Sequence, residues 1–281
     1  MKKIIFLFIL LFFSVLFSFQ SSFAQDSSQH MEGFNLVGYG DGGKKSWDVQ
    51  GDTATIADKE INITNVDANS YGQENMNVTA KNGHINKQDG NMRLEKDVVI
   101  TTQTGTKMLT DTLTWQKQKD LITTDDDVTI LRENMKAVGQ GLFARPSLNQ
   151  AQLNKNVVVE YQPTANNEGP MKEAIKISCD GPMEVDYKGQ SAVFHDHVVA
   201  FQAGRNLTAD QMELFFDAAK KQIKTIICTG NVVIVQGQNT SSSDKAIYDA
   251  SEQKIKLYGH PKLLMYMGDK GEKDKNVPFG S

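Results

Sequence analysis

The sequence predicts an all-β protein made of stacked, repeated units, and two observations support this prediction. Apolar and polar residues alternate with a period of two over short segments rich in Val, Ile and Thr, a pattern typical of half-buried strands. A short motif also recurs about every thirty residues, which is typical of units that bury their apolar faces against one another. Only residues 207–221 would also fit a helix, and alternation at Met212, Leu214 and Phe216 favours a strand followed by a turn there.

The composition argues against several classes of protein. The chain has 281 residues, a formal net charge of −4 and a mean hydropathy of −0.41. These values argue against a general nucleic-acid binder, a disordered chain and a polytopic membrane protein. Two Cys cannot build a disulfide scaffold or a four-cysteine zinc site. The length suits one elongated domain or two compact ones.

The first 24 residues have the order of a secretory signal peptide. Lys2 and Lys3 precede an apolar run over residues 4–19, and the small residues Ser22 and Ala24 suit cleavage after Ala24. The alternative is an uncleaved anchor, because the run is only slightly shorter than the roughly 17–25 residues that span a bilayer. Either interpretation predicts that the rest of the chain is exported.

The recurring motif is an Asp, Asn or His followed by a run of mainly β-branched residues. We interpret the polar residue as part of a turn that leads into a strand. The dipeptides Asp41-Gly42, Asn82-Gly83 and Asp89-Gly90 are further turn signals. The six copies of the motif are 97–100 (DVVI), 127–130 (DVTI), 156–159 (NVVV), 197–200 (HVVA), 231–234 (NVVI) and, more weakly, 260–263 (HPKL).

One step of the repeat is longer than the others and indicates a domain boundary. Residues 162–170 (QPTANNEGP) are polar, contain two prolines and have no periodicity, so we expect a linker. Two β modules are then expected at 33–161 and 171–267. The last segment, 268–281, is polar and charged and is expected to form a disordered tail.

Three small constellations contain residue types that occur in reactive or metal-binding sites. Cys179 and Cys228 both fall on the apolar side of alternating strands, which favours two buried thiols over a disulfide, although export makes a disulfide chemically possible. His195-Asp196-His197 places two imidazoles close together but has no third metal ligand, so an exposed turn is the preferred interpretation. The run 125–127 (DDD) lacks the spacing of a calcium loop and is interpreted as a polar turn.

Longer motifs in each module carry a resemblance to known families. In module one these motifs are 33–39 (GFNLVGY), 43–54 (GKKSWDVQGDTA), 105–115 (GTKMLTDTLTW), 134–141 (NMKAVGQG) and 153–157 (LNKNV), and in module two they are 179–183 (CDGPM), 207–212 (LTADQM), 230–232 (GNV) and 245–249 (KAIYD). Module one resembles LptC, a periplasmic component of the lipopolysaccharide export machine, and module two resembles the related OstA/LptA domain. Together the two resemblances cover nearly all of the mature chain.

The resemblance implies an open V-shaped or jelly-roll-like stack of antiparallel strands, the β-taco or OstA-like architecture. It implies an interior that holds the acyl chains of lipid A, no cofactor and no catalytic or metal site. It also implies three partners: lipopolysaccharide, an inner-membrane ABC transporter, and an LptA-like or outer-membrane OstA-domain protein joined by β-strand edge pairing. The chain shows no GxxxxGK[ST] loop of its own, so energy for transport would come from the transporter.

Inward-facing apolar residues are the candidates for acyl-chain contact. Alternation alone does not distinguish a lipid groove from a packed core, and a packed core is the more common outcome. The resemblance favours the groove. Two alternatives remain, namely a structural periplasmic adaptor with a filled core and a stacked-β polysaccharide hydrolase or lyase. The candidates are Leu94, Ile100, Leu113, Ile130 and Val157 in module one, and Phe194, Val198, Met212, Leu214, Phe216, Val232 and Ile234 in module two.

Overall fold

The computed structural model describes residues 28–39, 41–71, 75–162, 173–217 and 222–266. The predicted signal or anchor (1–24), nearly all of the predicted linker (162–170) and the predicted tail (268–281) lie outside the described residues. The described part is all-β, as predicted, with three short 3-10 turns at Asp41–Gly43, Lys117–Lys119 and Pro146–Leu148.

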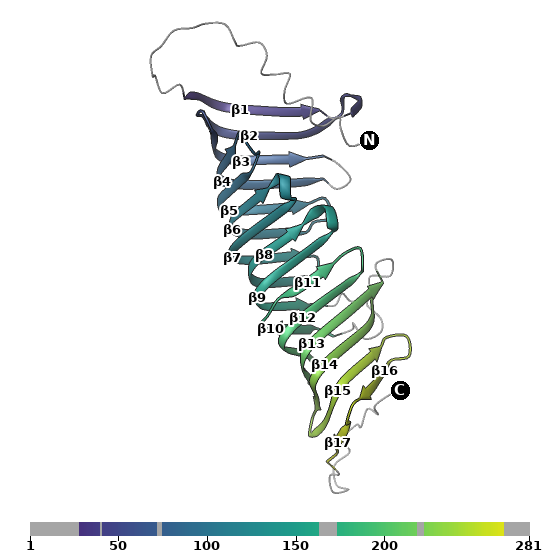
Figure 1. Cartoon of the computed structure of the whole chain (residues 1–281). Helices are drawn as coiled ribbons and strands as arrows, with labels where there is room; N and C mark the ends of the chain where they lie inside the picture. Colours follow the sequence, from purple (N-terminus) through teal and green to yellow (C-terminus); the bar gives the residue numbers. More distant parts are fainter. Residues whose placement is uncertain (1–27, 40, 72–74, 163–172, 218–221, 267–281) are drawn as a thin grey trace, which may run out of the picture.

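One antiparallel sheet contains all seventeen described strands (Figure 1). The first nine are β1 (Gln29–Tyr39), β2 (Lys45–Ile56), β3 (Glu60–Ser70), β4 (Met76–Asn86), β5 (Met92–Thr102), β6 (Lys107–Gln116), β7 (Leu121–Arg132), β8 (Met135–Arg145) and β9 (Gln150–Tyr161). The others are β10 (Ile175–Cys179), β11 (Met183–Asp186), β12 (Ser191–Gln202), β13 (Arg205–Asp217), β14 (Gln222–Gln236), β15 (Asn239–Asp249), β16 (Lys254–Tyr258) and β17 (Lys262–Leu264). Residues 207–217 are therefore strand, as predicted.

The strands stack in chain order along the length of the molecule (Figure 1). The short strands β10 and β11 share one layer between β9 and β12, and β16 and β17 share the last layer on β15. The seventeen strands therefore occupy fifteen layers. Because β9 of module one pairs along both arms with β10 and β11 of module two, the sheet passes from one module to the next without interruption.

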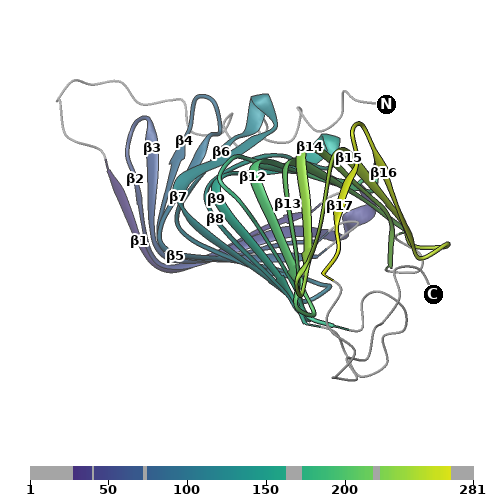
Figure 2. The ribbon, with the colours of Figure 1, turned by 90° about the horizontal axis from the view of Figure 1, so that it is seen from below.

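Each layer bends in its middle, so the stack is a trough with two arms (Figure 2). The bend coincides with the recurring motif, which was wrongly predicted to lead into a strand. Asp97, Asn156, His197 and Asn231 all have positive φ and lie inside long strands, where the pairing register shifts. Asp and Asn tolerate this conformation better than other non-glycine residues, which explains their recurrence at the bend.

The inside of the bend is filled by alternating large and small side chains. The residue after each bend residue is a Val, at most 5 % exposed, and it lies opposite a smaller residue of the neighbouring layer. Side chains converge on the inside of a bend, so a large residue in one layer requires a small one in the next. The pairs are Val66–Ala80, Val98–Thr110, Val128–Gly139, Val157–Cys179, Val198–Ala209 and Val232–Ser243.

The prediction of a turn at Asn82-Gly83 was wrong, because both residues lie within β4. Gly83 occupies an inward position on an arm of the trough, where a Cβ would approach Val66 Cγ2 to 2.8 Å. The glycine therefore provides space for a neighbouring core residue. Asp89-Gly90 does follow β4 in a turn, and Asp41-Gly42 forms a 3-10 turn, as predicted.

Candidate functional site

The inner face of the trough carries rows of apolar residues that run the length of the sheet. On one arm, residues in register form an apolar row from Leu36 on β1 to Leu263 on β17, interrupted only by Ser241. The row crosses the module boundary through Val159 and Ile177, which pair directly. The apolar inner face is therefore continuous between the two modules.

All twelve candidate residues lie on this inner face or inside the bend. Eight are buried: Leu94, Leu113, Val157, Phe194, Val198, Met212, Val232 and Ile234. The other four, Ile100, Ile130, Leu214 and Phe216, are partly buried and pack against the core. Val157, Val198 and Val232 belong to the bend, where they are at most 1 % exposed and pack in the core. The four partly buried candidates lie on the arms of the trough.

The buried apolar core consists of two clusters. One spans Ala54 to Leu113, and the other spans Val128 to Ala246 and includes residues of both modules. The division falls between β6 and β7, inside module one, and not at the predicted linker. Thr110 and Thr124 are buried at this point with their hydroxyl oxygens 3.4 Å apart, so two polar side chains interrupt the apolar core.

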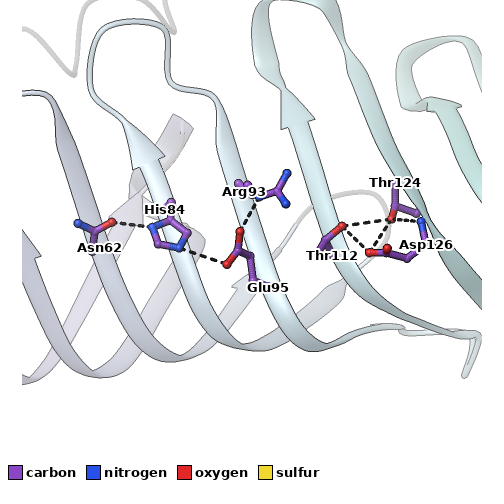
Figure 3. Close-up of polar contacts among 7 residues, drawn as sticks. All are labelled: Asn62, His84, Arg93, Glu95, Thr112, Thr124 and Asp126. Carbon is purple, nitrogen blue, oxygen red and sulfur yellow. Dashed lines mark hydrogen bonds and ion pairs between the residues drawn. The ribbon is translucent and has the colours of Figure 1, made fainter.

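The outer face of module one carries a series of polar contacts across β3 to β7 (Figure 3). His84 Nδ1 lies 2.6 Å from Asn62 Oδ1, and its Nε2 lies 3.7 Å from Glu95, whose carboxylate accepts a 2.6 Å hydrogen bond from Arg93. Farther along the same face, between β6 and β7, Asp126 accepts a 2.6 Å hydrogen bond from the Thr112 hydroxyl (Figure 3). Along this series the outer face of module one is polar, in contrast to the apolar inner face.

Polar contacts also follow the outside of the bend. Each joins a residue of one layer to the positive-φ residue, or the residue beside it, in the next described layer. Most are highly exposed, so each contributes little stability. The contacts are Asp52–Asn65 (2.5 Å), Lys81–Asp97 (2.5 Å), Asp180–His197 (3.0 Å), Asp210–Asn231 (3.0 Å) and Asp244–His260 (3.0 Å).

The segment 195–197 belongs to this bend. His197 pairs with Asp180, whereas His195 Nε2 lies 3.8 Å from Glu184, so the two imidazoles have separate partners. Within the described residues no group of three or more His, Cys, Asp or Glu side chains is arranged to hold a metal ion. The run 125–127 lies at the bend of β7, where the register shifts, and not in a separate turn.

Both cysteines are free and buried, as preferred from the sequence. Cys179 is the small member of a bend pair, and burial raises the pKa of its thiol to about 11. Burial likewise raises the pKa of Cys228 to about 12. Both thiols are protonated at neutral pH and unsuited to nucleophilic chemistry.

Sequence reasoning missed a buried aspartate near the first edge of the sheet. Asp48 on β2 is 1 % exposed, and its carboxylate lies 2.7 Å from Lys45 Nζ and accepts a 3.1 Å hydrogen bond from Asn69. Hydrogen bonds from Lys45 and then Tyr71 lower the Asp48 pKa to about 2. Nothing in the sequence signalled this burial, because Asp48 directly precedes the inward Val49 and by alternation should have been exposed.

The sheet has two free edges in the described part of the chain. There β1 pairs only with β2, and β16 and β17 pair only with β15. No helix among the described residues has both the length and the apolar character needed to cross a bilayer.

The sequence that forms this continuous apolar trough matches two family models, one after the other along the chain. Residues 4–162 match the model described as lipopolysaccharide-assembly, LptC-related, which covers more than half of the chain. The chain belongs to the LptC-related family. Residues 176–277 of this LptC-related protein match a second model, described as the LptA/(LptD N-terminal domain) LPS transport protein. A search of curated proteins finds no match.

The two matches confirm the resemblance found in the sequence, including the order of the two modules. They associate this LptC-related protein with lipopolysaccharide transport, a function of families that are not enzymes. Proteins of these families are periplasmic. The first match also begins at residue 4, within the apolar N-terminal run.

Proposed function

We propose that this protein carries lipopolysaccharide through the periplasm by holding lipid A acyl chains in the trough. The observation that supports the proposal is the apolar row in register from Leu36 to Leu263 on one arm, which gives an acyl chain a similar environment in every layer. Burial of each CH₂ group stabilises binding by about 0.8 kcal/mol relative to water. A uniform lining gives little net gradient along the trough, so movement requires energy from an ABC transporter.

The two free edges support a role as a connector. An unpaired edge offers a row of backbone N–H and C=O groups to a strand of another protein. We propose that β1 faces the inner-membrane transporter and that β16 and β17 receive an LptA-like or outer-membrane OstA-domain partner. Fusion of the two modules then replaces one intermolecular joint by a covalent one, which raises the effective concentration of the second module.

We propose that the N-terminal run is retained as an inner-membrane anchor, because the LptC-related match includes it. Mass spectrometry of the protein purified from cells tests this proposal. A mature chain that begins at Gln25 would contradict it and support the signal peptide.

Site-specific photo-crosslinking in cells tests lipid binding. A photoreactive residue replaces Leu214 or Phe216, which face inward on β13, or the neighbouring outward residues Glu213 and Phe215 as matched controls. We expect lipopolysaccharide adducts at 214 and 216 and none at 213 and 215. Adducts at neither inward position in a functional chain would contradict the proposal.

A structural adaptor with a filled core is the second candidate function. The observation that favours it is the nearly complete burial of inward residues such as Phe194 and Met212, both 2 % exposed. The same crosslinking experiment distinguishes the two, since an adaptor with a filled core gives no lipid adducts at positions 214 and 216. For lipid to enter, side chains of the two arms must separate, as expected of a binding site that is closed without its ligand.

A further inference from the structure

A second site, unrelated to the inner face, lies on the outside of the trough near the boundary between the modules. Two cavities of about 440 and 290 Å³ adjoin there, because Phe143 of β8 and Gln152 of β9 line both. These two residues pair directly and alternate with the buried, inward-facing Leu142 and Leu153. Together the cavities form a groove across β7, β8, β9, β11 and β12, which we call the outer groove.

The outer groove is lined mainly by polar side chains. Its amides and hydroxyls both donate and accept hydrogen bonds, and its carboxylates accept them. Gln152 and Asn154 lie beside Asp125 in the first cavity, and Gln152 donates a 3.0 Å hydrogen bond to Asn154. In the second cavity Glu184 and Asp186 project from the same side of β11. The ring of Phe143 lies in the middle, with the Arg145 guanidinium carbon 5.5 Å from the ring centroid.

This chemistry fits a sugar better than other ligands. Each sugar hydroxyl donates and accepts a hydrogen bond, which amides and carboxylates satisfy, while the C–H face of the ring packs on an aromatic side chain. Three carboxylates line the groove and one cation, Arg145, lies over the Phe143 ring, so the charge around the groove is net negative and disfavours a phosphate or another anion. A neutral or amino sugar is favoured.

The spacing of the strands adds a geometric argument. Neighbouring layers lie about 4.8 Å apart, close to the length of one sugar unit in an extended glycan, so successive layers present polar groups in step with successive sugars. Five layers span roughly 19 Å, which corresponds to about four or five sugar units. The outer row Thr123, Phe143, Gln152, Glu184 and Val193 is in register across all five layers.

We propose that the outer groove binds an extended glycan of neutral or amino sugars. The site does not depend on the lipid trough, because Phe143, Gln152 and Glu184 in the middle of the groove point away from the inner face. Two sources of such a glycan are exported cell-wall polysaccharide and the saccharide part of lipopolysaccharide, and the experiment separates them.

Titration calorimetry of the full chain tests the proposal. The probes are hexamers of β-1,4-linked glucose, N-acetylglucosamine and glucosamine, soluble cell-wall glycan fragments, and the saccharide released from lipopolysaccharide by mild acid. We expect binding of at least one neutral or amino glycan, weakened about tenfold or more by Glu184→Ala and by Gln152→Ala, each of which removes one hydrogen-bonding group.

The matched control is Glu213→Ala, because Glu213 lies in the same outer row as Glu184 but two layers beyond it and outside the groove. This variant should bind the glycan as well as the unmodified protein. Thermal unfolding of all three variants identifies a loss of binding caused by misfolding, and Ser191→Trp, which fills the groove, provides an independent test. The proposal is overturned if no probe binds or if the groove variants bind as well as Glu213→Ala.

Discussion

Val157 of β9 and Cys179 of β10 lie directly opposite each other at the bend, and their side chains are 0 % and 3 % exposed. Val157 belongs to module one and Cys179 to module two. The boundary that the two family matches define therefore passes through one shared core. The modules are separate in sequence but packed together as one body.

Val157→Ala should destabilise both modules at once. Loss of two buried methyl groups and the resulting cavity should lower the free energy of unfolding by about 2 kcal/mol. Chemical denaturation followed by circular dichroism should show one transition at a lower midpoint. Val199→Ala, on the outer face and 37 % exposed, is the control and should change stability by less than about 0.5 kcal/mol. Two separated transitions would contradict the shared core.

Gly230→Ala should be more destabilising than Gly237→Ala, although both glycines have positive φ. A Cβ on Gly230 would lie 2.2 Å from Asp210 Oδ2, whereas a Cβ on Gly237 meets nothing within 4 Å. Both variants lose about 1 kcal/mol from backbone strain, and only Gly230→Ala also displaces the aspartate that bonds to Asn231. Equal midpoints in thermal unfolding would show that the bend contact is unimportant.

The thiols should resist alkylation in the folded protein. Because burial raises the pKa of Cys179 to about 11 and of Cys228 to about 12, iodoacetamide at pH 8 should modify neither. In denaturant the same reagent should add two groups, as measured by intact mass. Rapid labelling of the native protein, or a mass two units low that is restored by reductant, would contradict two buried free thiols.

The first strands of the sheet should lose stability in acid because of Asp48. Its pKa of about 2 in the folded protein lies below the usual value of 3.8, so the ionised form is favoured by folding. This contribution is fully present above about pH 4 and is lost as the pH falls toward 2. Trp47 is the adjacent residue, so its fluorescence in a Trp115→Phe background should report the change.

Asp48→Asn is the matched variant for this measurement. It should be less stable than the unmodified protein at pH 7 and should lack the change between pH 4 and pH 2. An identical acid transition in both proteins would assign the pH dependence to other carboxylates.

The sequence predicted the all-β fold, the two modules and the inward face of all twelve candidates, because alternation reports directly which side of a strand is buried. It did not predict where the strands begin. Asp97 and Asn231 have the residue types of turns, yet a bend within a strand requires the same backbone conformation. Residue type alone does not distinguish a turn before a strand from a bend within a strand, because both use the same positive-φ backbone conformation.

The sequence contains a second signal of the bend. The dipeptides Cys179-Asp180, Ala209-Asp210 and Ser243-Asp244 each place a small residue inside the bend and an Asp outside it. They alternate with the Asn-Val and His-Val dipeptides, so the repeat spans two layers. The outer groove had no comparable signal, because Gln152 and Glu184 come from different modules and meet only through the pairing of β9 with β11.

The number of layers determines the direction of the strand that another protein must present at each free edge of the sheet. Every described layer runs antiparallel to the next, and fifteen is odd, so β1 and the last layer, formed by β16 and β17, point in the same direction. Two copies placed end to end would therefore meet through parallel strands, which pair slightly less favourably. A partner that continues the antiparallel pattern must present a strand of the opposite direction, and this requirement is the same at both ends.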